Sequence, residues 1–119
     1  MVQEVNHMNK IILTNAFSIN MLHGTTMVDF NEITIEQAKE LITSADEFVC
    51  AIGHADTANV VGGLLGMELE PNRISVTLDF PEKLVIAQYT GPRLAEGATI
   101  LPEGATIKFW EVCEIRYTR

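Results

Sequence analysis

The chain has 119 residues, of which 47% are hydrophobic, and this combination is typical of one globular domain with a substantial core. Its formal net charge of -8 argues against binding of long DNA or RNA, because nucleic acid is held mostly by Lys and Arg on phosphates. A small anionic ligand in a pocket remains compatible with this charge, since a few Arg residues and backbone amides decide the local field.

The location of the protein is indicated by what the sequence lacks. No apolar run approaches the ~20 residues that span a bilayer, and the first residues lack the apolar segment of a secretory signal. We therefore expect a cytoplasmic protein without membrane contact. Cys50 and Cys113 each lie in an apolar strand-like segment. We interpret them as buried free thiols in a reducing compartment, rather than as a disulfide or a metal site.

The first third of the chain predicts two strands and a short turn. Residues 1–7 show no periodicity, and we interpret them as a flexible N-terminal extension before a single domain of residues 8–119. The apolar segment Lys10–Thr14 predicts a first strand. A loop with a short helical turn should follow, with Ser18 as a candidate N-cap. The Thr and Val content of residues 25–30 favours a second strand.

Two helices are predicted on either side of a buried strand at Phe48–Ile52. Thr34 and Gln37 have the spacing of a capping box, so a helix should begin there and run to about Ala45. It should bury Ile35, Ala38, Leu41 and Ile42. A second helix should follow the strand, with Asp56 as its cap and an apolar face of Val60, Val61, Leu64 and Leu65. The Gly62-Gly63 pair weakens this helix and suggests close approach of the sheet or of a second subunit.

The second half of the chain predicts a hairpin and a final strand. Residues 73–80 alternate between apolar and polar and are followed by the strand-like segment Lys83–Thr90. Gly91-Pro92-Arg93 forces a bend, and a loop-rich crossing leads to a last strand over residues 106–117 that is apolar on both faces. The predicted fold class is α/β, with a single compact domain and a mixed sheet of five to six strands flanked by helices.

The junction at His54 is the strongest candidate for chemistry. It lies where the buried strand ends and the second helix begins. The first turn of a helix offers unpaired N-H groups and partial positive charge, which suit a phosphate or carboxylate. A histidine in this place can exchange a proton near neutral pH beside the bound anion.

Further candidates lie at strand ends and turns, where functional residues tend to occur. They are Asn15, Ser18, Asn20, Arg73, Arg93 and Glu96. Each also has an ordinary interpretation, as a loop polar group, a solvated strand-end charge or part of a turn, and Asp56 as a simple helix cap. Together, one His, a few Arg and several amides, without a metal-ligand cluster, suit metal-free cleavage of a phosphate ester.

A family resemblance supports that chemistry. The segment from Met8 to Leu22, MNKIILTNAFSINML, closely resembles the amino terminus of the viral-type ring nucleases, formerly a domain of unknown function. Similar blocks follow in the family's order and cover nearly all of the chain from Met8 onward. They are Ala51-Ile52-Gly53-His54 with Thr57, Asn72-Arg73, and Gln88 leading to Arg93-Leu94-Ala95-Glu96-Gly97.

The resemblance implies an enzyme that cuts cyclic tetra-adenylate, the second messenger of type III CRISPR systems, into linear di-adenylate with a 2',3'-cyclic phosphate. It implies a homodimer that encloses the ring, with no metal and no cofactor, encoded by viruses or mobile elements or by some cells. Carried onto this chain, His54 would be the general acid, Arg93 would hold the scissile phosphate and Glu96 would assist. The ligand pocket would be lined by Asn15, Ser18, Asn20, Arg73 and Gln88.

The chain departs from the family pattern at two places. Members often have Asp-Ser-Thr after the histidine, whereas Ala55-Asp56-Thr57 places the carboxylate of Asp56 where a serine would meet the ligand. The segment Tyr89–Pro92 is one residue longer than in some relatives. Two other functions fit the sequence, namely a non-catalytic protein that sequesters or senses a cyclic nucleotide, and a small regulatory protein of a mobile element.

Overall fold

A computed structural model describes residues 9–115 of the chain. The prediction about residues 1–7 and the last two residues of the predicted strand 106–117 therefore fall outside the described residues. The elements follow one another as β1 (Lys10–Thr14), the 3-10 helix η1 (Ile19–Met21), β2 (Met27–Ile33), α1 (Ile35–Thr43), β3 (Glu47–Cys50), α2 (Ala55–Leu65), β4 (Lys83–Thr90) and β5 (Thr106–Ile115).

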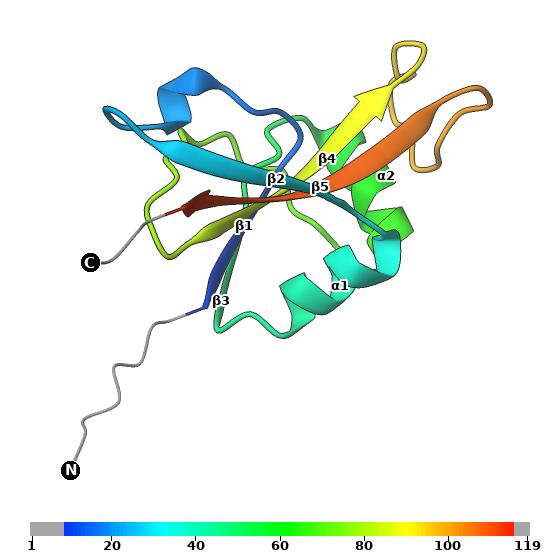
Figure 1. Ribbon diagram of the computed structural model, residues 1–119. Helices are drawn as coiled ribbons and strands as arrows, with labels where there is room; N and C mark the ends of the chain where they lie inside the picture. The colour runs from blue at the N-terminus through cyan, green and yellow to red at the C-terminus, as the bar shows by residue number, and fades with distance from the viewer. Residues whose placement is uncertain (1–8, 116–119) are drawn as a thin grey trace.

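One five-stranded mixed sheet forms the centre of the molecule, in the order β2-β5-β4-β1-β3 (Figure 1). Strand β1 pairs in parallel with β3 on one side and with β4 on the other. Strand β5 is antiparallel to both of its neighbours, β2 and β4. This confirms the predicted α/β fold class with a mixed sheet and flanking helices.

The two faces of the sheet are covered differently. One core joins α1 and α2 to one face, through residues such as Ala38, Ile42, Val61 and Leu65 packed on Ile11, Leu13 and Val85. The helices lie together on this side in Figure 1. A second core on the other face is closed by loop segments, including Phe17, Met21 and Leu78 packed near Ile12, Leu84 and Ile86. Because β5 contributes Phe109 to the first core and Val112 to the second, the prediction that it is covered on both faces is confirmed.

Several features that were predicted from local sequence patterns are confirmed. Thr34 and Gln37 form both hydrogen bonds of the capping box, at 2.9 and 3.0 Å, and α1 ends at Thr43, slightly before the expected end. Ser18 caps η1 by accepting a hydrogen bond from the Asn20 N-H. Strand β2 lies later than predicted, because its pairing with β5 continues to Ile33 opposite Phe109.

The predicted strand at residues 73–80 is wrong, and with it the hairpin to β4. This segment is irregular backbone that lies over the second core. Leu78 is 1% exposed and its N-H donates to the Met21 carbonyl at 2.8 Å, whereas Ile74 and Phe80 are 45% and 46% exposed. Of the four alternating apolar residues only Val76 and Leu78 pack on the second core, so the alternation does not mark the buried face of a strand.

The cysteines are half-buried rather than buried, and both are free thiols. Cys50 is on β3 and Cys113 on β5, which are not adjacent in the sheet. Burial raises the pKa of the Cys113 thiol, and the negative charge of Asp29 adds to this effect. Within residues 9–115, the helices are too short or too polar to cross a membrane.

The paired glycines of α2 differ in their surroundings. A Cβ added at Gly62 would lie 2.6 Å from the Met67 carbonyl oxygen, and the Met67 N-H donates back to the Gly62 carbonyl at 2.9 Å. The close approach at Gly62 is therefore made by the chain just after α2, and not by the sheet. A Cβ at Gly63 would meet its nearest neighbour, the Thr99 carbonyl oxygen, at 3.4 Å.

This contrast predicts opposite effects for two neighbouring substitutions. Gly62→Ala should lower the free energy of unfolding by about 1–3 kcal/mol, because backbone atoms must move to accept the methyl group. Gly63→Ala should leave it unchanged or raise it by up to about 1 kcal/mol through better helix propensity. Urea unfolding of both variants measures the difference, and equal effects would contradict the close approach at Gly62.

Candidate functional site

The parallel strands bring several loops to one edge of the sheet. Because β1 pairs in parallel with β3 and β4, their carboxyl ends face the same way. The segments that follow these strands begin at Asn15, Ala51 and Gly91 and contain most of the predicted site residues. The carboxyl edge of parallel strands is where ligands commonly bind in open α/β sheets.

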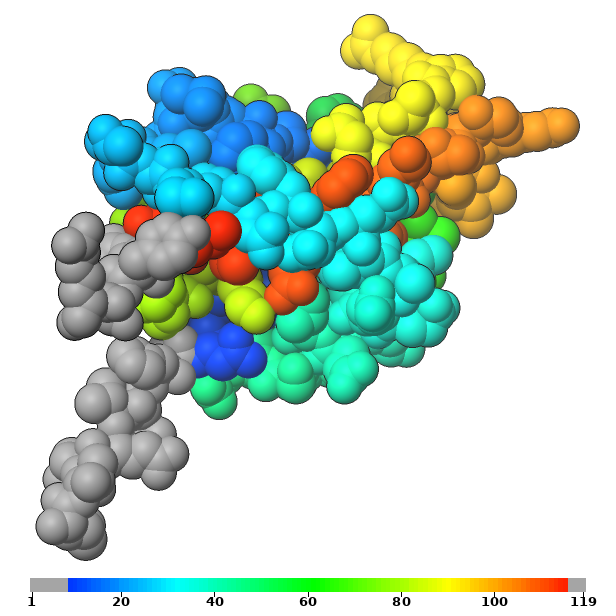
Figure 2. Space-filling model, viewed as in Figure 1, coloured from blue at the N-terminus to red at the C-terminus, as the bar shows by residue number. Residues whose placement is uncertain are grey.

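A cavity of about 520 Å³ lies at this edge, between the start of α2 and the segment that follows β4. The connection between β4 and β5, drawn from yellow to orange, projects from the body of the molecule (Figure 2). The cavity is lined by Gly53, His54, Ala55, Asp56, Arg93, Leu94 and Glu96. The three predicted catalytic residues and Asp56 therefore share one cavity, although they come from segments about 40 residues apart in the chain.

His54 is the N-cap of α2, a role that the sequence analysis assigned to Asp56. Its Nδ1 accepts a hydrogen bond from the Asp56 N-H at 3.3 Å, and its carbonyl accepts from the Ala58 N-H at 3.0 Å. The cap prediction was wrong because the helix begins at Ala55, two residues earlier than the Thr57 start that a cap at Asp56 would require. With Nδ1 acting as acceptor, the neutral ring carries its proton on Nε2. The side chain is 64% exposed, so it is accessible to a ligand.

Asp56 makes a contact that links two parts of the site. Its Oδ1 accepts a hydrogen bond from the Gly97 N-H at 3.0 Å, across 41 positions of sequence. Its Oδ2 lies 3.9 Å from His54 Nδ1, and its side chain is only 13% exposed. The carboxylate thus lies between the helix that carries His54 and the segment that carries Arg93 and Glu96.

The segment with Arg93 is also fixed at its other end. The Tyr89 hydroxyl donates a hydrogen bond to the Pro92 carbonyl. Gly91 has φ +150°, and a Cβ there would lie 2.7 Å from the Ala105 Cβ. Glycine is therefore required by both the backbone conformation and the close packing of this turn.

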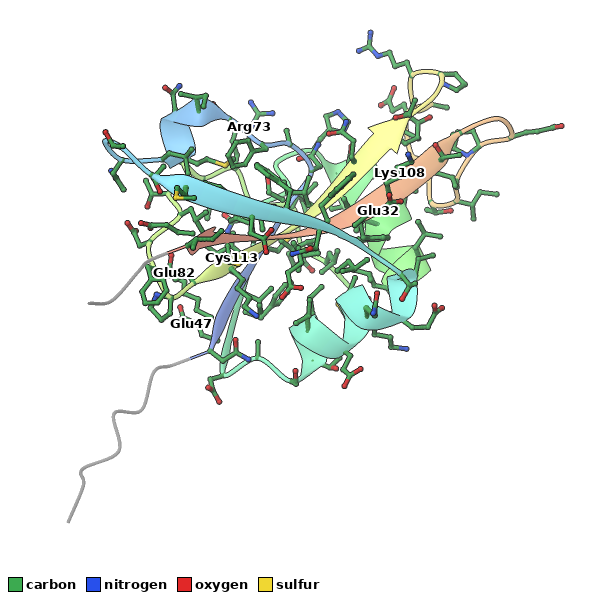
Figure 3. All side chains as sticks on the ribbon, in the orientation of Figure 1. Glu32, Glu47, Arg73, Glu82, Lys108 and Cys113 are labelled. Carbon is green, nitrogen blue, oxygen red and sulfur yellow. The ribbon has the colours of Figure 1, made fainter. Side chains whose placement is uncertain are left out.

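Arg73 lies at the margin of the cavity. Its Cβ is 3.3 Å from the position that a Cβ on Gly53 would occupy, so the absence of a side chain at Gly53 allows this approach. Asn72 fixes the segment, because its N-H donates to the Ile52 carbonyl and its Nδ2 to the Cys50 carbonyl, both at 2.8 Å. Figure 3 shows Arg73 on the loop-covered side of the sheet, away from α1.

Besides Arg73, which does not itself line the cavity, four predicted ligand residues lie outside it. Gln88 is exposed on β4, and its Nε2 donates to the Tyr89 carbonyl at 3.3 Å. Ser18 and Asn20 take part in the cap of η1. Together with Asn15, they lie in the loop that follows β1. Asn15 and Gln88 thus lie near the carboxyl ends of β1 and β4 but outside the cavity, whereas Ser18 and Asn20 belong to η1, whose Met21 packs on the second core.

Sequence reasoning missed the contacts that hold the site together. The bond between Asp56 and Gly97 and the bonds of Asn72 join residues too distant in sequence to leave a local signal. The Gly-Pro-Arg turn and the glycine before His54 were the features of the sequence that indicated close packing. Within residues 9–115, no group of three or more His, Cys, Asp or Glu side chains is placed to hold a metal ion.

The arrangement combines a proton donor with groups that suit an anion. His54 can donate a proton, Arg93 can contact a phosphate oxygen, and the first turn of α2 points its N-H groups toward this edge. Two carboxylates, Asp56 and Glu96, offset the charge of Arg93 and of protonated His54. The cavity is therefore suited to a phosphate that is held by directed contacts rather than by excess positive charge.

Comparisons with known proteins agree with this fold. Residues 11–118 match the model of the STIV B116-like family. The structure resembles B116 of Sulfolobus turreted icosahedral virus with a TM-score of 0.75 and 32% identity, covering 88% of this chain and 99% of that one.

Two similar sequences are viral proteins described as uncharacterized. ORF116 of Acidianus filamentous virus 1 is 38% identical over 98 residues, covering 82% of this chain and 83% of the relative. Protein 26 of Sulfolobus islandicus filamentous virus is 36% identical over 74 residues, covering 62% of this chain and 61% of the relative. The chain therefore belongs to the STIV B116-like family, and its matched relatives are proteins of archaeal viruses.

Proposed function

We propose that the protein is a metal-independent ring nuclease that cleaves cyclic tetra-adenylate. The observation that carries this proposal is the shared cavity of His54, Arg93 and Glu96 at the carboxyl edge of the sheet. The resemblance of the first strand and loop to viral-type ring nucleases supports the choice of substrate. The viral relatives support a role in switching off type III CRISPR signalling in the cytoplasm of an infected host.

The chemistry requires a proton donor and stabilisation of negative charge. The ribose 2'-oxygen attacks the neighbouring phosphorus and loses its proton to solvent, while the bond from phosphorus to the 5'-oxygen breaks. Protonated His54 gives its proton to the departing 5'-oxygen. Arg93 and backbone N-H groups of α2 stabilise the charge on the phosphate oxygens, and Glu96 assists in positioning. Cleavage at two opposite phosphates gives linear di-adenylate with a 2',3'-cyclic phosphate.

A homodimer would match the symmetry of the ring. A cyclic ligand with repeated units fits a two-fold site in which each protomer presents its own His54 to an equivalent phosphate. His54 is 64% exposed in the single chain, so a second protomer would also help to exclude water from the reaction. Asn15, Ser18, Asn20, Arg73 and Gln88 would extend the contact beyond the cavity toward the bases and riboses.

The direct test is incubation of the purified protein with cyclic tetra-adenylate and cyclic hexa-adenylate in excess EDTA. We expect linear di-adenylate with a 2',3'-cyclic phosphate from the tetramer, identified by mass spectrometry, at an undiminished rate in chelator. Stoichiometric protection of the ring without linear product would contradict the enzyme and favour the non-catalytic binding protein. Absence of both cleavage and a ligand-induced rise in melting temperature would favour the regulatory protein.

The role of His54 can be tested without loss of its helix cap. His54→Asn keeps a side-chain acceptor for the Asp56 N-H, since Asn is a strong N-cap, but it removes the proton donor. Cleavage should fall by about 100-fold or more, whereas binding of the ring should persist. His23→Asn is the matched control, because His23 is exposed and pairs with Asp79 outside the cavity. Wild-type cleavage by His54→Asn would remove this residue from the mechanism.

The turn at Gly91 provides a test of Arg93 placement. Gly91→Ala would force the turn away from Ala105, and cleavage should fall by about tenfold or more as Arg93 moves. Gly104→Ala is the control, because Gly104 also has positive φ, +81°, but has nothing within 4 Å of an added Cβ. Both rates are measured at saturating ligand. A comparable loss of cleavage in the two variants would mean that backbone strain, and not the position of Arg93, is responsible.

A further inference from the structure

We propose that Asp56 is a positioning residue, which aligns the segment carrying Arg93 and Glu96 against the helix that carries His54. This inference rests on the proposed function. Its structural basis is one long-range hydrogen bond, from the Gly97 N-H to Asp56 Oδ1 at 3.0 Å. Gly97 directly follows Glu96, so the bond fixes the end of the segment that holds both charged residues.

The bond completes a clamp on residues 91–97. At the start of this segment, the Tyr89 hydroxyl holds the Pro92 carbonyl, and Gly91 packs tightly on Ala105. Asp56 holds the other end. Between these two ends, the side chains of Arg93 and Glu96 line the cavity. Without Asp56, the second end would lose its hydrogen bond to α2 and keep packing such as that of the Thr99 carbonyl near Gly63.

The second oxygen of Asp56 faces the histidine. In the neutral ring, Nδ1 accepts the Asp56 N-H, and this interaction is lost when Nδ1 itself carries a proton. Oδ2 lies 3.9 Å from Nδ1, where it can accept from the protonated ring after a small adjustment. One carboxylate thus contacts both the proton donor and the segment that holds the phosphate-binding arginine. The carboxylate itself is 13% exposed.

This assignment differs from a role in ligand binding. A carboxylate beside a phosphate opposes binding, and the observed partner of Oδ1 is a backbone N-H of the protein. The Asp56 carboxylate therefore weakens the attraction of the site for an anion, but it holds the surrounding groups in a fixed geometry. Misplacement by about 1 Å can reduce a rate by 10²-fold, so a positioning contact of this kind has a measurable effect.

Three variants separate the hydrogen bond from the charge. Asp56→Asn removes the charge but keeps an oxygen that accepts from Gly97, whereas Asp56→Ala removes both. Glu36→Gln is the control for charge, because Glu36 occupies the corresponding second position of α1 and does not line the cavity. Each variant is assayed for hydrogen exchange of the Gly97 amide, for melting temperature, and for kcat and KM on cyclic tetra-adenylate.

We expect Asp56→Ala to speed exchange of the Gly97 amide by at least about tenfold and to lower kcat by about 10- to 100-fold. Asp56→Asn should keep Gly97 protected, lose less kcat than Asp56→Ala because only the interaction with His54 is weakened, and lower KM because a repulsive charge is gone. Glu36→Gln should behave as the parent in all assays. A kcat in Asp56→Asn as low as that of Asp56→Ala, or unchanged Gly97 exchange in Asp56→Ala, would overturn the proposal.

The exchange measurement needs no catalysis, so it separates the two proposals. A parent protein that does not cleave the ring would refute the ring nuclease, and the positioning role with it, even where Gly97 exchange responds to Asp56→Ala. A parent that cleaves, combined with unchanged Gly97 exchange and an unchanged kcat in Asp56→Ala, would refute only the positioning role.

Discussion

The parallel pairing of β1 with both β3 and β4 decides where the candidate site lies. Backbone hydrogen bonds fix the registers Leu13 opposite Cys50 and Thr14 opposite Ile86, so three loops must leave the sheet at one edge. Helix α2 then starts at the same edge, and its N-cap is His54. A functional site assembled from distant segments is therefore a consequence of strand direction, and not of any one loop.

Charge is distributed unevenly between the two edges of the sheet. At the amino edge, Lys10 lies 3.2 Å from Glu82, which raises the pKa of this lysine, and Lys83 lies 3.0 Å from Glu111. Figure 3 shows Glu47 and Glu82 at this end, away from the connection that follows β4. Within residues 9–115 the only arginines are Arg73 and Arg93, and both lie at the carboxyl edge. An acidic protein can thus present its planar, phosphate-matching cations in one place.

The elements that were predicted correctly from the sequence are those determined by residues close together in the chain. The capping box of α1 and strand β4 each depend on residues within a few positions of one another. The strand prediction for residues 73–80 failed because its apolar alternation has no continuous buried face: Leu78 is buried, whereas Ile74 and Phe80 are exposed. The predicted cap of α2 was wrong because the side chains of His54 and Asp56 can both accept a hydrogen bond at a helix start, so the local sequence does not decide which of them is the cap. The Asp56 contact with Gly97 spans 41 positions and had no local signal.

The balance of charge in the cavity bears on how a ligand could be selected. His54 and Arg93 are opposed by Asp56 and Glu96, and the whole chain carries a net charge of -8, so long-range attraction cannot gather anions at this site. Binding must then come from contacts that act only at short distance, such as backbone N-H groups, the planar guanidinium and the loop polar groups along the edge. Such contacts favour a ligand whose shape fills the site over one that is merely charged. A site of this kind discriminates by geometry, which is the property that the proposed ring nuclease would need to tell a cyclic nucleotide from linear nucleic acids.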